Sequence, residues 1–141
     1  MPKALTLISA VGLFAALGVS PVVAGEAGGI EAQAVVQRQL DAFKRGDADG
    51  AFALASPALK ENFSDSGAFM EIVRAKYAPF FRRRMAEFGT LAIAGDTAAQ
   101  SIVIVDEDSD VWNVVYELGR QPDGSWAVSN CLLMKSDSTD A

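Results

Sequence analysis

The spacing of the apolar residues changes near Arg83, and this change limits the fold more than any other feature of the sequence. Before Arg83 the apolar residues recur every three or four positions, which is the spacing of one face of an α-helix. After Arg83 they recur at every second position, which is the spacing of one face of a β-strand. A helical first half followed by a strand-rich second half predicts an α+β fold in one domain.

The first half of the chain predicts three helices. In AQAVVQRQLDAFKRGD the residues Ala32, Val36, Leu40 and Phe43 form one apolar stripe, and Gly46 ends that helix. Residues with short polar side chains precede the later helices, where they can accept hydrogen bonds from free amides of the first turn. Pro79 stops the third helix. The candidate caps are Asp47 or Asp49, Ser56 before Pro57, and Asp65 or Ser66.

The second half predicts an antiparallel meander of four strands, over residues 83–93, 98–106, 111–120 and 125–134. Gly, Pro and acidic residues form the turns between them. In the third strand one face carries the apolar and aromatic residues, and we expect the helices to cover that face. Its members are Trp112, Val114, Tyr116 and Leu118.

The last strand does not keep a simple alternation. Trp126 and Cys131 have opposite parity, yet both have the character of core residues. A β-bulge between them would bring both side chains to the same face, so we expect one there.

The N-terminus has the order of a secretory signal peptide. Basic Lys3 precedes an uncharged apolar stretch, and small residues ending at Ala24 suit signal peptidase. We therefore expect residues 1–24 to be a cleaved signal peptide and residues 25–141 to be a periplasmic or secreted domain without a membrane anchor. A second cut within residues 25–27 and an uncleaved anchor are the alternatives.

Charge and cysteine content exclude several kinds of partner and site. The net charge of −6 disfavours binding to nucleic acid. Cys131 is the single cysteine, so it has no internal partner, and we expect a buried thiol; an intermolecular disulfide is the alternative. The chain has no histidine, which excludes a His-dependent triad and makes a zinc site unpromising.

Three segments of the chain resemble a known family. They are QLDAFKRGDADGAFALASPALKENF, FMEIVRAKYAPFFRRRMAEFG and DGSWAVSNCLL, within residues 30–134. The chain resembles the secreted bacterial proteins of domain-of-unknown-function family 4864, in the nuclear transport factor 2-like superfamily. The resemblance implies a cystatin-like cone, with three N-terminal helices on a curved antiparallel sheet and a cavity between the two layers. Because the family is uncharacterised, the resemblance assigns no catalytic residue.

The three consecutive arginines, Arg82, Arg83 and Arg84, suggest an anion site. In an extended segment Arg82 and Arg84 point one way and Arg83 the other, so the three side chains do not converge. We expect a solvated rim that balances nearby acidic residues. The alternative is that Arg83 lies at the mouth of the cavity and receives a carboxylate or phosphate.

An acidic cluster has the carboxylate spacing of a calcium-binding loop. Asp106, Asp108 and Asp110 occupy positions 1, 3 and 5, and Glu117 occupies position 12. Position 6, however, is Val111 where the loop needs glycine, and the following residues read as a strand. We therefore expect an acidic hairpin turn, with no metal and no cofactor.

Taken together, these observations predict a non-catalytic protein that binds a small, largely apolar ligand in a cone-shaped pocket. The first alternative is a homodimeric interaction module with a filled core, in which Val111, Val115 and Leu133 face outward. The second is a cofactor-free isomerase or hydratase, which would need an acidic residue inside the cavity. The residues expected to line the pocket are Tyr77, Phe81, Trp112 and Tyr116, with Arg83 at its mouth.

Overall fold

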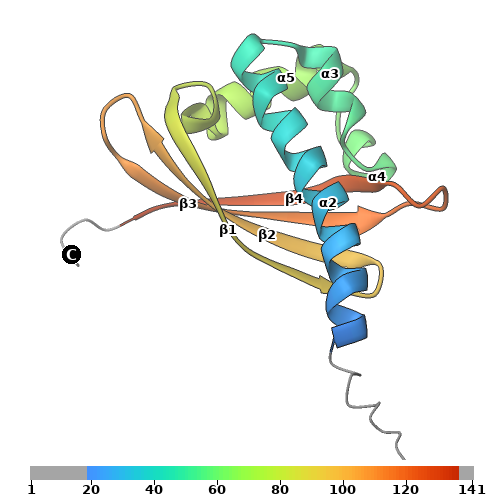
Figure 1. Ribbon diagram of the computed structural model, residues 1–141. Helices are drawn as coiled ribbons and strands as arrows, with labels where there is room; N and C mark the ends of the chain where they lie inside the picture. Colours follow the sequence, from blue (N-terminus) through green and yellow to red (C-terminus); the bar gives the residue numbers. More distant parts are fainter. Residues whose placement is uncertain (1–18, 137–141) are drawn as a thin grey trace, which may run out of the picture.

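The computed structural model describes residues 19–136, and it shows helices packed on one face of a curved sheet (Figure 1). Most of the predicted signal peptide, residues 1–18, lies outside the described residues. Within the part described, no helix has the length and apolar character that crossing a membrane requires.

The helical layer contains α2 (Val19–Arg45), α3 (Ala48–Ala53), α4 (Pro57–Lys60) and α5 (Ser66–Lys76). A 3₁₀ turn over Ala78–Phe80 follows and contains Pro79. The helices after α2 begin at capping residues that the sequence predicted. Asp47 caps α3 by accepting a hydrogen bond from the amide of Gly50 at 2.9 Å, and Ser56 caps α4 by accepting one from the amide of Leu59 at 3.2 Å. Asp65 accepts from the amide of Ala68 at 2.9 Å, so Asp47 and Asp65 are the caps rather than Asp49 and Ser66.

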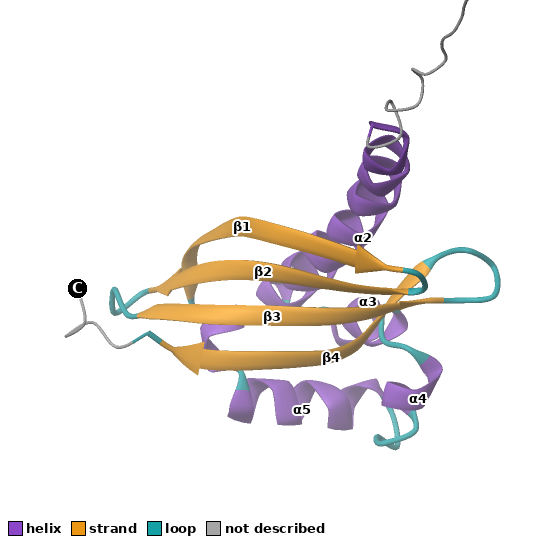
Figure 2. Cartoon of the chain, turned by 90° about the horizontal axis from the view of Figure 1, so that it is seen from below, coloured by secondary structure: helices purple, strands orange, loops and turns teal. Residues whose placement is uncertain are grey.

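The sheet contains β1 (Arg83–Ala94), β2 (Thr97–Asp106), β3 (Val111–Arg120) and β4 (Trp126–Lys135). The strands are antiparallel and lie in the order β1-β2-β3-β4, which confirms the predicted meander (Figure 2). The α+β architecture predicted from the change of period is therefore confirmed.

The core lies between α2 and the concave face of the sheet. The predicted stripe of α2 is buried, and so is the predicted face of β3, apart from half-buried Trp112. Ile102 and Ile104 of β2 are buried as well. The alternation along the strands therefore separates a face that packs on the helices from an outer face.

The predicted bulge is present in β4. Leu118 pairs with Val128 and Glu117 pairs with Asn130, so Ser129 is the extra residue between them. As a result both Trp126 and Cys131 belong to the inner side of the sheet.

The same bulge corrects one prediction about the outer face. Leu133 was expected to face outward, but it pairs with inward-facing Val114 and packs against the core. The outward residues of this segment are Leu132 and Met134, which are 46% and 57% exposed. The extra residue exchanges the two faces for every later position of the strand.

Candidate functional site

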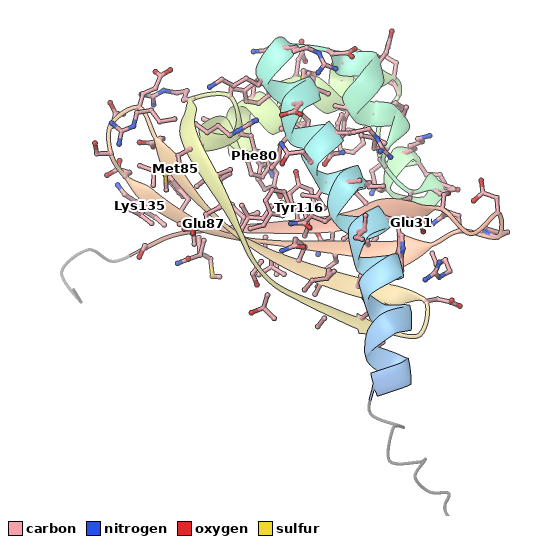
Figure 3. All side chains as sticks on the ribbon, in the orientation of Figure 1. Glu31, Phe80, Met85, Glu87, Tyr116 and Lys135 are labelled. Carbon is pink, nitrogen blue, oxygen red and sulfur yellow. The ribbon has the colours of Figure 1, made fainter. Side chains whose placement is uncertain are left out.

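A cavity of about 190 Å³ lies where α2, α5 and the inner side of β3 and β4 meet. Phe80 and Tyr116 contribute to its wall, and both lie between the helices and the sheet (Figure 3). Six of its lining side chains are aromatic: Phe43, Phe63, Phe69, Tyr77, Phe80 and Tyr116.

Each wall of the cavity follows from a local feature of the sequence. The apolar stripe of α2 supplies Phe43, and the buried face of α5 supplies Phe69 and Val73. The bulge in β4 falls between Val128 and Asn130, and both of these residues line the cavity. Bulges often re-aim side chains next to binding sites, and this bulge also brings Cys131 to the wall.

The loop between α3 and α4 is tied to the bulged strand at the cavity. The amide of Ser56 donates to the carbonyl of Val128 at 2.8 Å, and the amide of Val128 donates to the carbonyl of Leu54 at 2.8 Å. These two bonds hold the loop against β4, next to the point where Leu59 and Val128 meet the cavity.

The polar groups of the wall differ in how they are paired. The hydroxyl of Tyr77 donates to the carbonyl of Cys131 at 3.1 Å, and the amide of Gln39 donates to the carbonyl of Ala51 at 3.0 Å. Tyr116 is 0% exposed, yet its hydroxyl has no hydrogen-bond partner among the described residues. A buried hydroxyl without a partner is rare in folded proteins, so this group requires an explanation.

Three titratable groups of the wall stay protonated at neutral pH. Burial raises the pKa of Tyr116 well above its usual value; Cys131 and Tyr77 add to the rise, and the Arg83 guanidinium opposes it. Burial also raises the pKa of Tyr77, and it raises the pKa of the Cys131 thiol to about 12. The wall therefore presents neutral hydrogen-bond groups rather than a thiolate or phenolate.

Lys76 is the charged residue among those that line the cavity. It is exposed, in the last turn of α5, and forms no ion pair within residues 28–136. None of the described lining residues is an aspartate or glutamate. The cavity is thus an apolar chamber with neutral polar groups and one cation at its edge.

The structure brings together two of the five residues predicted to form the pocket. Tyr77 and Tyr116 line the cavity, whereas Phe81, Trp112 and Arg83 are not among its lining residues. The ring of Phe81 lies beside Phe43, with the guanidinium carbon of Arg74 4.7 Å from its centre. The indole nitrogen of Trp112 donates to Asp106 at 2.9 Å instead.

Arg83 links the helical layer to the sheet. Its guanidinium donates to the carbonyl of Leu40 at 2.8 Å and pairs with Asp41 at 3.0 Å. Arg82 pairs with Asp108 at 2.8 Å, and Arg84 is exposed. The arginine side chains therefore do not converge, as the extended geometry predicted.

The acidic cluster organises a turn between β2 and β3. Asp106 accepts hydrogen bonds from the amides of Asp108 and Asp110 and from the indole of Trp112. The bond from Trp112 is the main reason that the pKa of Asp106 is lowered. Asp106, Asp108 and Asp110 each bring a carboxylate oxygen to within 4.8 Å of the others, whereas Glu117 lies on β3 and accepts from Asn130.

Sequence reasoning missed most of the cavity wall. Gln39 is the lining residue for which the sequence carries a signal. It lies three positions after Val36 and four before Phe43, so it shares the buried face of the helix. Lys76 and Asn130 carried no such signal, because an exposed polar residue at the edge of a cavity resembles any surface residue.

Comparison with protein families gives one match that covers most of the chain. The model for "Domain of unknown function (DUF4864)" matches residues 26–141. No curated protein matches the chain.

Solved structures with the same fold are nuclear transport factor 2-like and ketosteroid isomerase-like proteins. An NTF2-like protein of unknown function from Shewanella baltica matches with a TM-score of 0.51 and 12% identity, over 76% of this chain and 92% of that one. A ketosteroid isomerase-like protein from Erwinia carotovora atroseptica matches with a TM-score of 0.52 and 13% identity, over 77% and 95%. A protein from Catenulispora acidiphila in complex with S-DNPA matches with a TM-score of 0.53 and 14% identity, over 79% of this chain and 95% of that one. At these identities the likeness shows the fold alone.

Proposed function

Since the chain belongs to the DUF4864 family of NTF2-like proteins, whose function is unknown, we propose that it is an exported, non-catalytic protein that binds a small, largely apolar ligand in the cavity between α2, α5 and the sheet. The S-DNPA complex of the Catenulispora acidiphila protein is a precedent for small-molecule binding on this fold.

The observation that carries this proposal is the cavity with its largely aromatic wall. Ligand sites are mostly apolar walls with a few polar groups that fix orientation. Here six aromatic side chains line the cavity, and the polar lining residues Lys76 and Asn130 are exposed.

The proposal of a non-catalytic role is supported by the chemistry of the wall. An isomerase or hydratase of the cofactor-free kind needs a base that ionises near neutral pH. The described lining residues offer no carboxylate, and the pKa of about 12 keeps the Cys131 thiol protonated. The wall is therefore better suited to holding a molecule than to moving a proton.

Export is proposed from the N-terminal sequence. Lys3, the uncharged apolar stretch after it and the small residues up to Ala24 form the order that signal peptidase recognises. The intact mass of the protein recovered from the periplasm or the medium should correspond to a chain that begins near residue 25. Recovery of the chain with Met1 in the membrane fraction would contradict export with cleavage.

Ligand binding can be tested by NMR titration with toluene or p-cresol, two single-ring probes. Methyl resonances of Leu59, Val73 and Val128 should shift, because these side chains line the cavity. Those of Leu132, on the outer face, should stay unchanged and serve as the internal control. Absence of shifts at near-saturating probe, or equal shifts on both faces, would contradict the proposal.

A matched pair of variants localises the binding. Ile72 lines the cavity and is 41% exposed, so Ile72→Trp should obstruct the opening and abolish the shifts with little effect on folding. Glu71→Trp is the control, because it places a Trp at the neighbouring exposed position, which does not line the cavity. This variant should bind the probes as the native protein does.

A homodimer is the second candidate, and the outer face of the sheet favours it. Leu132 and Met134 are exposed there and pair with Val115 and Asn113 of β3, next to exposed Val111. Such a patch is typical of interaction surfaces. Sedimentation at micromolar concentration should then show a dimer that Leu132→Glu dissociates, and a monomer would exclude it.

A further inference from the structure

Resting on the proposed function, we infer that the ligand is a neutral single-ring alcohol or phenol whose hydroxyl donates a hydrogen bond to the side-chain carbonyl of Gln39. The ring fills the apolar part of the cavity, and the hydroxyl lies at its inner end. Gln39 is a buried polar residue within the apolar stripe of α2. The orientation of its amide, the charges along the wall and the size of the cavity each contribute to this assignment.

The hydrogen bond to Ala51 fixes which end of the Gln39 amide is free. The carbonyl of Ala51 can only accept, so the amide nitrogen of Gln39 is the group that faces it, at 3.0 Å. The side-chain oxygen, Oε1, is therefore the free end, and no described residue donates a hydrogen bond to it. Gln39 is 2% exposed, and polar atoms in residues so deeply buried usually have a partner.

The Oε1 atom of Gln39 is open to the cavity rather than sealed in the core. Within residues 28–136, the buried side-chain atoms that lack both a partner and access to water belong to Gln100, Tyr116 and Trp126. Oε1 of Gln39 is not among them, so this unpaired atom keeps surface that a water molecule can reach. Because Gln39 lines the cavity, the cavity is the space that reaches Oε1.

Gln39 lies at the inner end of the cavity. The exposed lining residues, Ile72, Lys76 and Asn130, mark the opening and belong to α5 and β4. Gln39 is buried on α2, and its amide is bonded to α3. A molecule that enters past the exposed residues therefore brings its leading end to Gln39.

The free oxygen of Gln39 selects a donor, and the wall selects a neutral one. A ligand that displaces water from Oε1 without offering a donor leaves a buried acceptor unpaired and loses affinity. A carbonyl or carboxylate at this end would place its own lone pairs against those of Oε1. An ammonium group would be a buried cation, and none of the described lining residues is an aspartate or glutamate that could pair with it. A hydroxyl meets both conditions.

The volume of the cavity favours one ring with short substituents. About 190 Å³ is somewhat larger than a cavity of about 150 Å³ that holds benzene in another protein. A ring that carries a hydroxyl and a methyl-sized group would use the additional space. Aromatic and aliphatic side chains form most of the remaining wall, so the rest of the ligand needs no polar group.

The test is an NMR titration of the purified protein with two probes of nearly the same shape. In p-cresol a hydroxyl stands where p-xylene has a methyl group, so the comparison isolates the hydroxyl. We expect p-cresol to bind the native protein about fivefold more tightly than p-xylene, because p-xylene leaves Oε1 unpaired. The side-chain amide resonances of Gln39 should also shift more with p-cresol than with p-xylene.

Two variants assign the preference to its residue. Gln39→Met keeps the length of the side chain but removes the oxygen, so it would bury the hydroxyl of p-cresol without a partner. The order should then reverse, with p-xylene bound about tenfold more tightly. Tyr77→Phe is the matched control, because it removes from the same wall a hydroxyl that already donates to Cys131, and it should keep the native order. Both probes are compared within one variant, so a general loss of stability affects them equally.

The outcomes separate this inference from the proposed function. Equal or tighter binding of p-xylene to the native protein would overturn the role of Gln39 while leaving apolar binding intact, and so would a preference for p-cresol that survives in Gln39→Met. If Gln39→Met does not fold, equal shifts of the native Gln39 amide resonances with the two probes would overturn that role. Failure of both probes to bind would contradict the proposed function itself.

Discussion

The Tyr116 hydroxyl should reduce the stability of the ligand-free protein. An unpaired buried hydroxyl costs free energy, and Phe has the same ring without that group. We therefore expect Tyr116→Phe to raise the free energy of unfolding by about 1 kcal/mol in urea denaturation. This gain would show that the hydroxyl has no hydrogen-bond partner in the folded protein.

Tyr77→Phe provides the comparison within the same cavity. It removes a hydroxyl that donates to the carbonyl of Cys131 at 3.1 Å, so it should lower the free energy of unfolding by about 1 kcal/mol. The two Tyr→Phe variants should thus have opposite signs. A loss of stability in Tyr116→Phe would mean that its hydroxyl has a partner in solution.

Cys131 should react slowly and in a strongly pH-dependent way. With a pKa of about 12, roughly one thiol in ten thousand is ionised at pH 8, against about one in four for an ordinary cysteine. Alkylation of the native protein by iodoacetamide should therefore be about a thousandfold slower than that of the urea-unfolded chain. A native rate within tenfold of the unfolded rate would contradict the raised pKa.

The same shift predicts how Cys131 affects stability. The folded pKa is raised above the unfolded value of about 8.5, so the unfolded chain loses the proton first. The contribution of the neutral thiol is complete below about pH 8.5 and is lost as the pH rises toward 12.

At the scale of single residues, the sequence predicts which face of the sheet a side chain occupies better than it predicts which residues that side chain contacts. Alternation along the third strand correctly placed Tyr116 in the core. Trp112 shares that parity, but its indole turns to Asp106 and away from the cavity. The contacts that a side chain makes depend on residues distant in sequence, and the periodicity of one strand carries no information about those residues.

At the scale of elements, the caps give a direct test of how α5 begins. Asp65 accepts from the amide of Ala68 at 2.9 Å, and Ala cannot replace that bond. Asp65→Ala should lower the free energy of unfolding by about 1 kcal/mol in urea denaturation. Glu71→Ala, on the exposed side of the same helix, is the control and should change it by less than about 0.5 kcal/mol.

Strand boundaries and the bulge were accessible from the sequence because both depend on local pattern. Parity alone placed a bulge between Trp126 and Cys131, and the structure has it at Ser129. The expectation that Leu133 faces outward was wrong because it did not apply this bulge: Leu133 follows the bulge and has the same parity as inward-facing Cys131. One extra residue is enough to exchange the two faces.

At the scale of the whole molecule, the change of period was sufficient to predict helices on an antiparallel meander. The cavity was not accessible in the same way, because apolar residues follow the same pattern whether their side chains meet or leave space between them. The 190 Å³ beside Tyr116 arises from the relative placement of α2, α5 and the bulged β4. Short-range sequence patterns do not encode that placement.

Native mass spectrometry tests ligand binding by this chamber most directly. The protein would be purified gently from its own compartment and measured before and after addition of p-cresol. We predict one small-molecule adduct per chain, retained in Glu71→Trp and absent in Ile72→Trp. A protein that carries no ligand as isolated and gains no mass with the probe would contradict the account, and a ligand-free dimer would favour the interaction module instead.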